Sequence, residues 1–341
     1  MAHPTLETIA RIAGVSRATV SRVVNNDPRV GAETRERVRQ VIREQGYHPN
    51  AAARALVRGQ SRSIGLAAHE ALGTLFSHAY FPPLVQGIAD ACEQRGYSLV
   101  LSPLASQTPE GLMGVWQSGQ LDGVVVATAA VGDAFLARLQ EAHLPFVLVG
   151  PHHARPAIPW VSPDNVAGGR MAAEYLLSLG HRRVAAISGA RGLGTAMERL
   201  EGFCMAMAAA GAPVSDESIV EGDHTEAGGY AAMERLLSHA PGYEAVFCGN
   251  DLTAIGAMRA AKKAGLTVPD DLSVVGFDDV PLARMVDPPL TTIRQPITAL
   301  GAAAATLLID VLERPGELPP NAAPPLLPVE IVVRESCRAG R

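Results

Sequence analysis

The chain has 341 residues, of which 48% are hydrophobic and 18% charged, as in soluble globular proteins of two or three domains. No apolar run approaches the roughly 20 residues of a membrane-spanning helix, and Met1–Ala10 lacks the features of a secretory signal, so we expect a cytoplasmic protein. The net charge of −5 is uneven, because residues 1–62 carry eleven arginines against five acidic residues, which predicts a polyanionic partner for this basic end.

The first 48 residues predict short helices over Leu6–Ala13, Arg17–Asn25 and about 32–45. Thr5 and Ser16 carry hydroxyls that accept hydrogen bonds at helix N-termini, and a glycine follows the first and third helices. Helices of this length can together bury one small core. The pattern favours a helix-turn-helix DNA-binding domain over residues 1–48.

The outward side chains of the second helix suit the major groove of DNA, where a recognition helix places its N-terminal residues at base edges. Arg22 can donate two hydrogen bonds to a guanine. Arg17 can do the same or hold a phosphate, whereas Ala18 can offer only a methyl contact. The small polar side chains suit phosphates, which position a protein without specifying sequence: Ser16, Thr19, Ser21 and Asn25.

Residues 49–62 predict a short helix and a linker. Asn50 can cap one or two turns over Ala51–Val57, before Gly59 ends them. A helix this short is marginal alone in water. We therefore expect it to form only with support from outside the segment.

From Ser63 onward, apolar strand patterns alternate with helical ones, which is typical of parallel sheets covered on both faces. Two successive sets of such units predict two similar lobes within residues 63–341. The first lobe is expected over about 63–162 plus 292–325, and the second over about 163–291 plus 326–341. The candidate strands are Ile64–Ala68, Ser98–Leu101, Gly123–Ala127, Phe146–Val149, Val184–Ser188, Ala245–Cys248 and Ser273–Phe277.

The run Leu6-Glu-Thr-Ile-Ala-Arg-Ile-Ala-Gly-Val-Ser-Arg-Ala-Thr-Val-Ser-Arg-Val-Val-Asn25 closely resembles the lactose/galactose repressor (LacI/GalR) family of transcription regulators. This resemblance implies an all-α helix-turn-helix head and an α/β core of two Rossmann-like lobes, similar to periplasmic sugar-binding proteins. Matching motifs continue in order along nearly the whole chain: Thr34–Val38, Gly46–Asn50, Gly180–Val184, Arg199–Phe203, Asn250–Ala254, Val275–Asp279 and Pro289–Pro296.

The resemblance implies that positions 17, 18 and 22 govern operator choice, and that hinge helices of a dimer pair in the minor groove. Leu56 matches the leucine that wedges into the central base step, where flexible pyrimidine–purine steps yield most easily. The expected DNA-contacting residues are Thr5, Leu6, Ser16, Arg17, Ala18, Thr19, Ser21, Arg22, Asn25, Arg29, Thr34, Tyr47, Asn50, Ala53 and Leu56.

The resemblance also implies a ligand between the lobes, at the carboxyl ends of the strands. Arginine, carboxylate and amide groups suit sugar hydroxyls, and aromatic rings suit an apolar sugar face. The sequence departs from many sugar sensors at Gly150-Pro151, at Asp223-His224 and at Leu193. The expected effector-binding residues are His78, Tyr80, Phe81, Asp164, Asn165, Leu193, Thr195, Arg199, His224, Asn250, Asp278 and Gln295.

We therefore expect a homodimeric repressor that binds a palindromic double-stranded operator and is released by a sugar or sugar derivative. A purine- or nucleoside-responsive regulator with a corepressor is the main alternative, because Tyr80-Phe81 suits a flat base as well. The chain after Leu327–Glu335 shows no leucine heptads, so a dimer is expected rather than a tetramer. A sugar-transport component is less consistent with the basic head and the missing export signal.

Enzymatic activity, cofactors and metals are not expected. Gly189–Gly194 has the spacing Gly-x-x-Gly-x-Gly rather than that of a dinucleotide loop. We find no nucleophile elbow, zinc-protease motif or phosphate-binding loop. The four cysteines are far apart, which favours reduced thiols. His152-His153 is expected in a solvated loop rather than at a metal.

Overall fold

The computed structural model describes residues 4–25, 27–47, 60–68, 78–101, 109–127, 134–152, 158–239, 242–314 and 326–340. The chain forms two compact units, Met1–Ser61 and Arg62–Arg341. The expected hinge helix over 50–57 lies outside the described residues.

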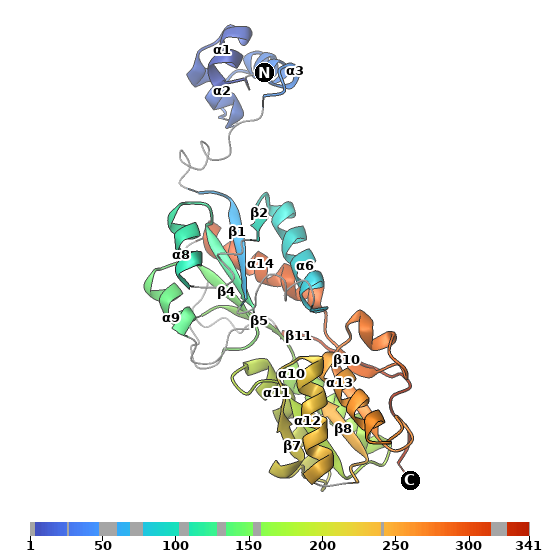
Figure 1. Cartoon of the computed structure of the whole chain (residues 1–341). Helices are drawn as coiled ribbons and strands as arrows, with labels where there is room; N and C mark the ends of the chain where they lie inside the picture. The colour runs from blue at the N-terminus through green and yellow to red at the C-terminus, as the bar shows by residue number, and fades with distance from the viewer. Residues whose placement is uncertain are drawn as a thin grey trace. The chain divides into compact units, whose positions relative to one another are not determined.

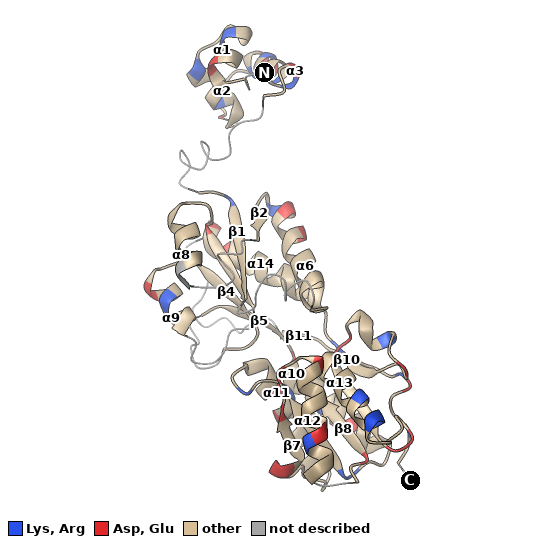
Figure 2. Ribbon diagram, viewed as in Figure 1, with Lys and Arg blue, Asp and Glu red and all other residues tan. Residues whose placement is uncertain are grey.

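The first unit, which we call the head, contains helices α1 (Leu6–Ala13), α2 (Arg17–Val24) and α3 (Ala32–Glu44). The caps are as expected from the sequence: the Thr8 amide donates to Thr5 Oγ1 at 3.3 Å, and the Thr19 amide donates to Ser16 Oγ at 3.1 Å. Gly14 ends α1 in the left-handed region, with φ of 64°, where glycine has no steric cost. Arginine residues occur on each of these helices (Figure 2).

A small apolar core holds the head together. Ile9, Val20 and Val38 come from different helices, and each is fully buried. Apolar side chains at helical spacing form one face of each helix, and the opposite face is polar. The outward face of α2 is therefore determined by the same packing that buries its valines.

The second unit, which we call the core, contains two sheets with helices on both faces (Figure 1). The first sheet has the order β11-β5-β4-β3-β1-β2, and all of these pairs are parallel. Alternate residues of β3 enter different apolar clusters, because side chains alternate along a strand. Its strands are β1 (Ser63–Ala68), β2 (Ser98–Val100), β3 (Gly123–Ala127), β4 (Phe146–Val149), β5 (Trp160–Pro163) and β11 (Leu326–Leu327).

Helices α6 (Phe81–Arg95) and α14 (Ile297–Glu313) pack side by side on one face of the first sheet, although they are far apart in sequence (Figure 1). Glycines allow their close approach: a Cβ at Gly87 would lie 1.9 Å from the Thr298 carbonyl oxygen, which a real contact cannot show. Helices α8 (Pro109–Gln117) and α9 (Ala134–Glu141) pack against the other face of this sheet, where their leucines join an apolar cluster with residues of β3 and β4.

The second sheet has the order β12-β10-β9-β8-β6-β7 and is parallel except for the β10–β12 pair. Helices α10 (Asn165–Ser178) and α11 (Gly194–Ala209) cover one face, while α12 (Glu226–His239) and α13 (Asp251–Lys263) cover the other. Its strands are β6 (Val184–Ser188), β7 (Ile219–Glu221), β8 (Ala245–Cys248), β9 (Ser273–Asp278), β10 (Thr291–Arg294) and β12 (Glu330–Val332); short 3-10 helices η1 (Asp216–Ser218) and η2 (Pro281–Arg284) accompany them.

The structure corrects the expected boundaries at the crossings between lobes. Residues 292–294 belong to β10 of the second sheet, although the sequence assigned 292–325 to the first lobe. Conversely, β11 at 326–327 pairs with β5 of the first sheet. The reason is pairing register: β10 lies opposite β9 from Thr291 to Arg294, so the chain leaves the second sheet only before α14. Strands β5 and β7 were also missed.

Candidate DNA-binding surface and effector site

Helix α2 exposes the three side chains that the sequence predicts to read bases. Arg17, Ala18 and Arg22 are exposed, while Val20 and Val23 are buried. Thr19 and Ser21 are half-buried beside them. The arginines of this face can therefore reach a groove without disturbing the core of the head.

Several other predicted DNA contacts already have partners within the head. The hydroxyls of Thr5 and Ser16 cap helices, and Asn25 Nδ2 donates to the Ser21 carbonyl at 2.9 Å. Arg29 Nη2 lies 2.7 Å from Asp27 Oδ2, and its hydrogen bonds hold the pKa of Asp27 well below the ordinary value. A phosphate contact from Arg29 would compete with this pair.

The remaining residues predicted to contact DNA differ in how far their side chains are exposed to solvent. Tyr47 is buried and packs with the apolar core of the head, and Leu6 is half-buried against the same cluster. Thr34, on α3, is also half-buried. The hinge residues Asn50, Ala53 and Leu56 lie outside the described residues.

Buried polar side chains meet where strands of the second sheet end. Arg199 on α11 is buried, and its guanidinium carbon lies 3.8 Å from the centre of the Phe277 ring. Arg199 Nη1 donates to Asp278 Oδ1 at 3.1 Å and to the Gly249 carbonyl at 2.7 Å. Its Nε donates to Asn165 Oδ1 at 3.0 Å. We call Arg199, Asn165, Asp278 and Gln295 the Arg199 cluster.

Gln295 and Asp278 leave hydrogen-bonding capacity in this cluster. Gln295 Nε2 donates to Asp278 Oδ1 at 2.5 Å, but Gln295 Oε1 is buried and has no partner among the described residues. No described partner occupies Arg199 Nη2 or Asp278 Oδ2 either. Burial raises the pKa of Asp278, and the positive charge of Arg199 opposes that rise. The Arg199 cluster thus contains both hydrogen-bond donors and hydrogen-bond acceptors that have no partner among the described residues.

His224 lies near this cluster in a conformation set by its neighbours. Its φ is 65°, and Asn250 Nδ2 donates to its carbonyl at 3.0 Å. Its ring packs over Gly189, because a Cβ there would lie 2.0 Å from His224 Nε2. Burial lowers the pKa of His224 to about 4, with further lowering by the charges of Arg199 and His78.

Asp164 and Asn250 both serve as helix caps. The Ala167 amide donates to Asp164 Oδ1 at 2.9 Å, where α10 begins. The Thr253 amide donates to Asn250 Oδ1 at 2.9 Å, where α13 begins. Asp164 Oδ1 and the single side-chain oxygen of Asn250 therefore already accept a hydrogen bond, which reduces the acceptors that either residue can offer a ligand.

The aromatic residues of the first lobe that were predicted to contact the effector differ in burial. Phe81 is buried in the core of the first sheet, so its ring is not free to stack on a ligand. Tyr80 and His78 are half-buried and meet Phe81 edge-on, with ring centres 5.5 and 5.7 Å away. Burial raises the pKa of the Tyr80 hydroxyl, and the charge of Asp278 adds to the rise.

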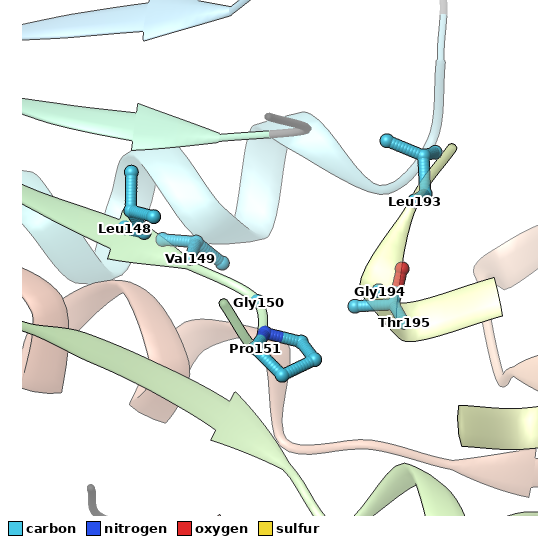
Figure 3. A pocket seen from close by; sticks show the side chains of 7 residues that line it. All are labelled: Leu148, Val149, Gly150, Pro151, Leu193, Gly194 and Thr195. Atoms are coloured by element: carbon cyan, nitrogen blue, oxygen red, sulfur yellow. The ribbon is translucent and has the colours of Figure 1, made fainter. Parts of the chain in front are cut away.

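A separate small pocket brings together two of the three places where the sequence departs from the family pattern, Gly150-Pro151 and Leu193. Gly150 and Pro151 follow β4, and they face Leu193, Gly194 and Thr195 at the start of α11 (Figure 3). The approach is close, since a Cβ at Gly194 would lie 2.6 Å from the Pro151 carbonyl oxygen. The remaining lining residues are Leu148 and Val149.

His152 is a candidate that the sequence interpretation missed. It was expected in a solvated loop, yet it is only 2% exposed, and neither ring nitrogen has a partner among the described residues. An unpaired buried imidazole is costly unless something else satisfies it. The available signal was its position directly after Gly150-Pro151, at the carboxyl end of β4. His153 lies outside the described residues.

Comparison with known proteins places these features in a family. The profile described as "Bacterial regulatory proteins, lacI family" matches residues 5–50, and that of a "Periplasmic binding protein-like domain" matches residues 173–337. The transcriptional regulator CelR of Thermobifida fusca is 37% identical over 337 residues, which are 98% of each chain. The chain belongs to the LacI family. It is a DNA-binding transcriptional regulator and not an enzyme.

Other members of the LacI family agree in sequence and structure. The PurR repressor of Klebsiella pneumoniae is 38% identical over 311 residues, covering 90% of this chain and 89% of PurR. A CelR–cellobiose complex superposes with a TM-score of 0.74 at 35% identity, covering 98% of this chain and 99% of that one. The Lac repressor dimer bound to operator gives 0.84 at 28% identity, over 99% and 100%.

No helix within the described ranges is long and apolar enough to cross a membrane. Likewise, the described residues contain no group of three or more histidine, cysteine or acidic side chains placed to hold a metal ion.

Proposed function

We propose that this LacI-family regulator binds a palindromic operator as a homodimer and is released when a sugar enters the core. The exposed face of α2, with Arg17, Ala18 and Arg22, supports the reading of bases. Two heads of a dimer would meet two half-sites, which accounts for a palindrome. Since its target is DNA, we also propose a cytoplasmic location.

The Arg199 cluster is the observation that carries the sugar assignment. A sugar hydroxyl both donates and accepts hydrogen bonds, and adjacent hydroxyls require donors and acceptors side by side. Arg199 Nη2 supplies donors, while Gln295 Oε1 and Asp278 Oδ2 supply acceptors that lack described partners. Satisfying the buried Gln295 oxygen would contribute to affinity because its desolvation has already occurred on folding.

The similarity to CelR, which has been solved with cellobiose, supports a glucose-containing disaccharide as the effector. A purine corepressor is the second candidate, favoured by the similarity to PurR. The buried ring of Phe81 argues against it, because a flat base gains most from an open aromatic face.

The effector would act by shifting a population between two states of the core. It must bind the state with low DNA affinity more tightly than the DNA-bound state, or no release follows. We propose that the hinge over 50–57 folds in the DNA-bound dimer and melts when the effector binds, because a helix this short needs external support.

A thermal-shift screen with cellobiose, glucose, sugar phosphates and purine bases tests this assignment. We expect cellobiose or a related sugar to raise Tm and to weaken operator binding. Stabilisation by purines alone, together with tighter DNA binding, would support the corepressor alternative. A ligand at 100 times its Kd stabilises by about 2.7 kcal/mol, which is easily detected.

Leu56→Ala tests the proposed hinge. An apolar wedge acts only at the deformable step of a specific site, so operator affinity should fall much more than affinity for random-sequence DNA. The two affinities should be measured at the same salt concentration, because phosphate contacts depend on it. Equal losses on both DNAs would contradict the wedge.

His152→Phe tests whether the buried imidazole serves the effector. Removing an unpaired buried imidazole while keeping an aromatic ring should leave stability unchanged or raise it by about 1 kcal/mol. If His152 binds the effector, the thermal shift produced by cellobiose should shrink while the unliganded Tm does not fall. A variant that loses Tm but retains the full ligand-induced shift would make His152 a structural residue.

A further inference from the structure

An ion pair joins the first two helices of the head at the start of α2. Arg17 Nε lies 2.9 Å from Glu7 Oε1, and Glu7 sits in the first turn of α1. Arg17 is the first residue of α2 and shares its outward side with Ala18 and Arg22. A residue outside α2 therefore contacts one of the arginines expected to read bases.

This pair contributes little to holding the head together. The side chains of Arg17 and Glu7 are 69% and 61% exposed, and pairs this exposed contribute little to stability. The burial of Ile9, Val20 and Val38 already joins the three helices. The carboxylate is nevertheless kept ionised, since a hydrogen bond with its own backbone lowers the pKa of Glu7, helped by Thr5 and Arg17.

The geometry of the contact leaves the reading edge of the guanidinium open. A guanidinium has five N–H donors, of which Nε carries one. Glu7 engages Arg17 at Nε, and the described residues provide no other partner for Arg17. Nη1 and Nη2 thus remain available, and two donors side by side match O6 and N7 of guanine in the major groove.

Holding the arginine in advance reduces the cost of binding. A free arginine side chain loses rotamer entropy when binding immobilises it. A second helix that restrains Arg17 before contact removes part of that cost. Once DNA excludes water, the attraction between Glu7 and Arg17 also strengthens, because the local dielectric falls.

We infer that Glu7 is a positioning residue for operator recognition, which holds the guanidinium of Arg17 so that Arg17 reads a guanine. The inference rests on the proposed base-reading role of α2. Glu7 was not among the residues that the sequence assigned to DNA contact. It acts through Arg17 and contributes to specificity rather than to overall attraction, since its own charge opposes the phosphates.

The test is selection of binding sites from a random double-stranded DNA library with the full-length chain. Wild type should recover a recurring site, and Arg17→Ala should identify the base pair that Arg17 reads. Glu7→Ala should reduce the preference for guanine at that same base pair by about three- to tenfold, and Glu7→Gln by less. Adding Glu7→Ala to Arg17→Ala should change that preference no further.

Glu36→Gln is a matched control. Glu36 pairs with Arg43 within α3 at 2.8 Å, with side chains 65% and 63% exposed, and its replacement changes the charge of the head equally. It should leave the base preference unchanged, and thermal unfolding should show that all variants fold. Losses at a different base pair, losses that add to those of Arg17→Ala, or no loss would each overturn the inference. Failure of wild type to recover any site would instead overturn the base-reading role of α2.

Discussion

Replacing Arg199 by alanine should cost the core about 3–5 kcal/mol and abolish its response to the effector. Arg199 and Asp278 are both buried, and their contact at 3.1 Å compensates two charges that have left water. Removing one partner leaves the other charge buried and unpaired, which is the most costly way to break such a pair. Urea unfolding and the ligand-induced thermal shift would measure the two effects.

Arg170→Ala provides the matched control for this prediction. Arg170 pairs with Glu174 at 2.7 Å along α10, but both side chains are about half exposed. Its replacement should cost less than about 1 kcal/mol and leave the effector response intact. If Arg199→Ala lowered the free energy of unfolding as little as Arg170→Ala does, the prediction that the buried ion pair is costly to break would be wrong.

A double variant separates stability from ligand binding. Replacing Arg199 by methionine and Asp278 by asparagine removes both buried charges, so that neither is left unpaired, and asparagine tolerates the positive φ of 115° at position 278. We expect Tm to recover while the effector shift stays absent. Recovery of both would show that the cluster supports the fold alone.

Lowering the pH from 7.5 to 5 should destabilise the core by about 2 kcal/mol through His224. The pKa of its imidazole is lowered from the ordinary value of 6.5 to about 4 by burial, then by Arg199 and His78, with Asp223 acting in the opposite direction. The unfolded chain therefore binds a proton between pH 6.5 and 4 that the folded chain does not, so stability falls as pH falls through that window.

The measurement compares urea unfolding of wild type and His224→Asn at both pH values. Asparagine does not titrate, and it tolerates the positive φ of this position. The variant should lose about 2 kcal/mol less than wild type on acidification, because other groups titrate equally in both proteins. His239→Gln, at an exposed position on α12, should keep the wild-type difference. An unchanged difference in His224→Asn would refute a neutral imidazole at position 224 of the folded chain.

The sequence predicted those features of the fold that depend on interactions between residues only a few positions apart. Ser16 and Thr5 cap the helices that they were expected to cap, and the valines of α2 face inward. The crossings between lobes were not predictable, because β10 and β11 are assigned by long-range pairing with β9 and β5. Periodicity reports which face of a segment is apolar, but not which sheet it joins.

Sequence by itself determined the family, the basic head and most polar residues that line the carboxyl ends of the second sheet. It did so because motifs, charge and strand order are written along the chain. Tertiary structure alone decided how those residues are used. It buried Phe81 and Tyr47, and it left Gln295 Oε1 and His152 without described partners. Hydrogen-bond satisfaction depends on which distant groups meet, and only packing determines that.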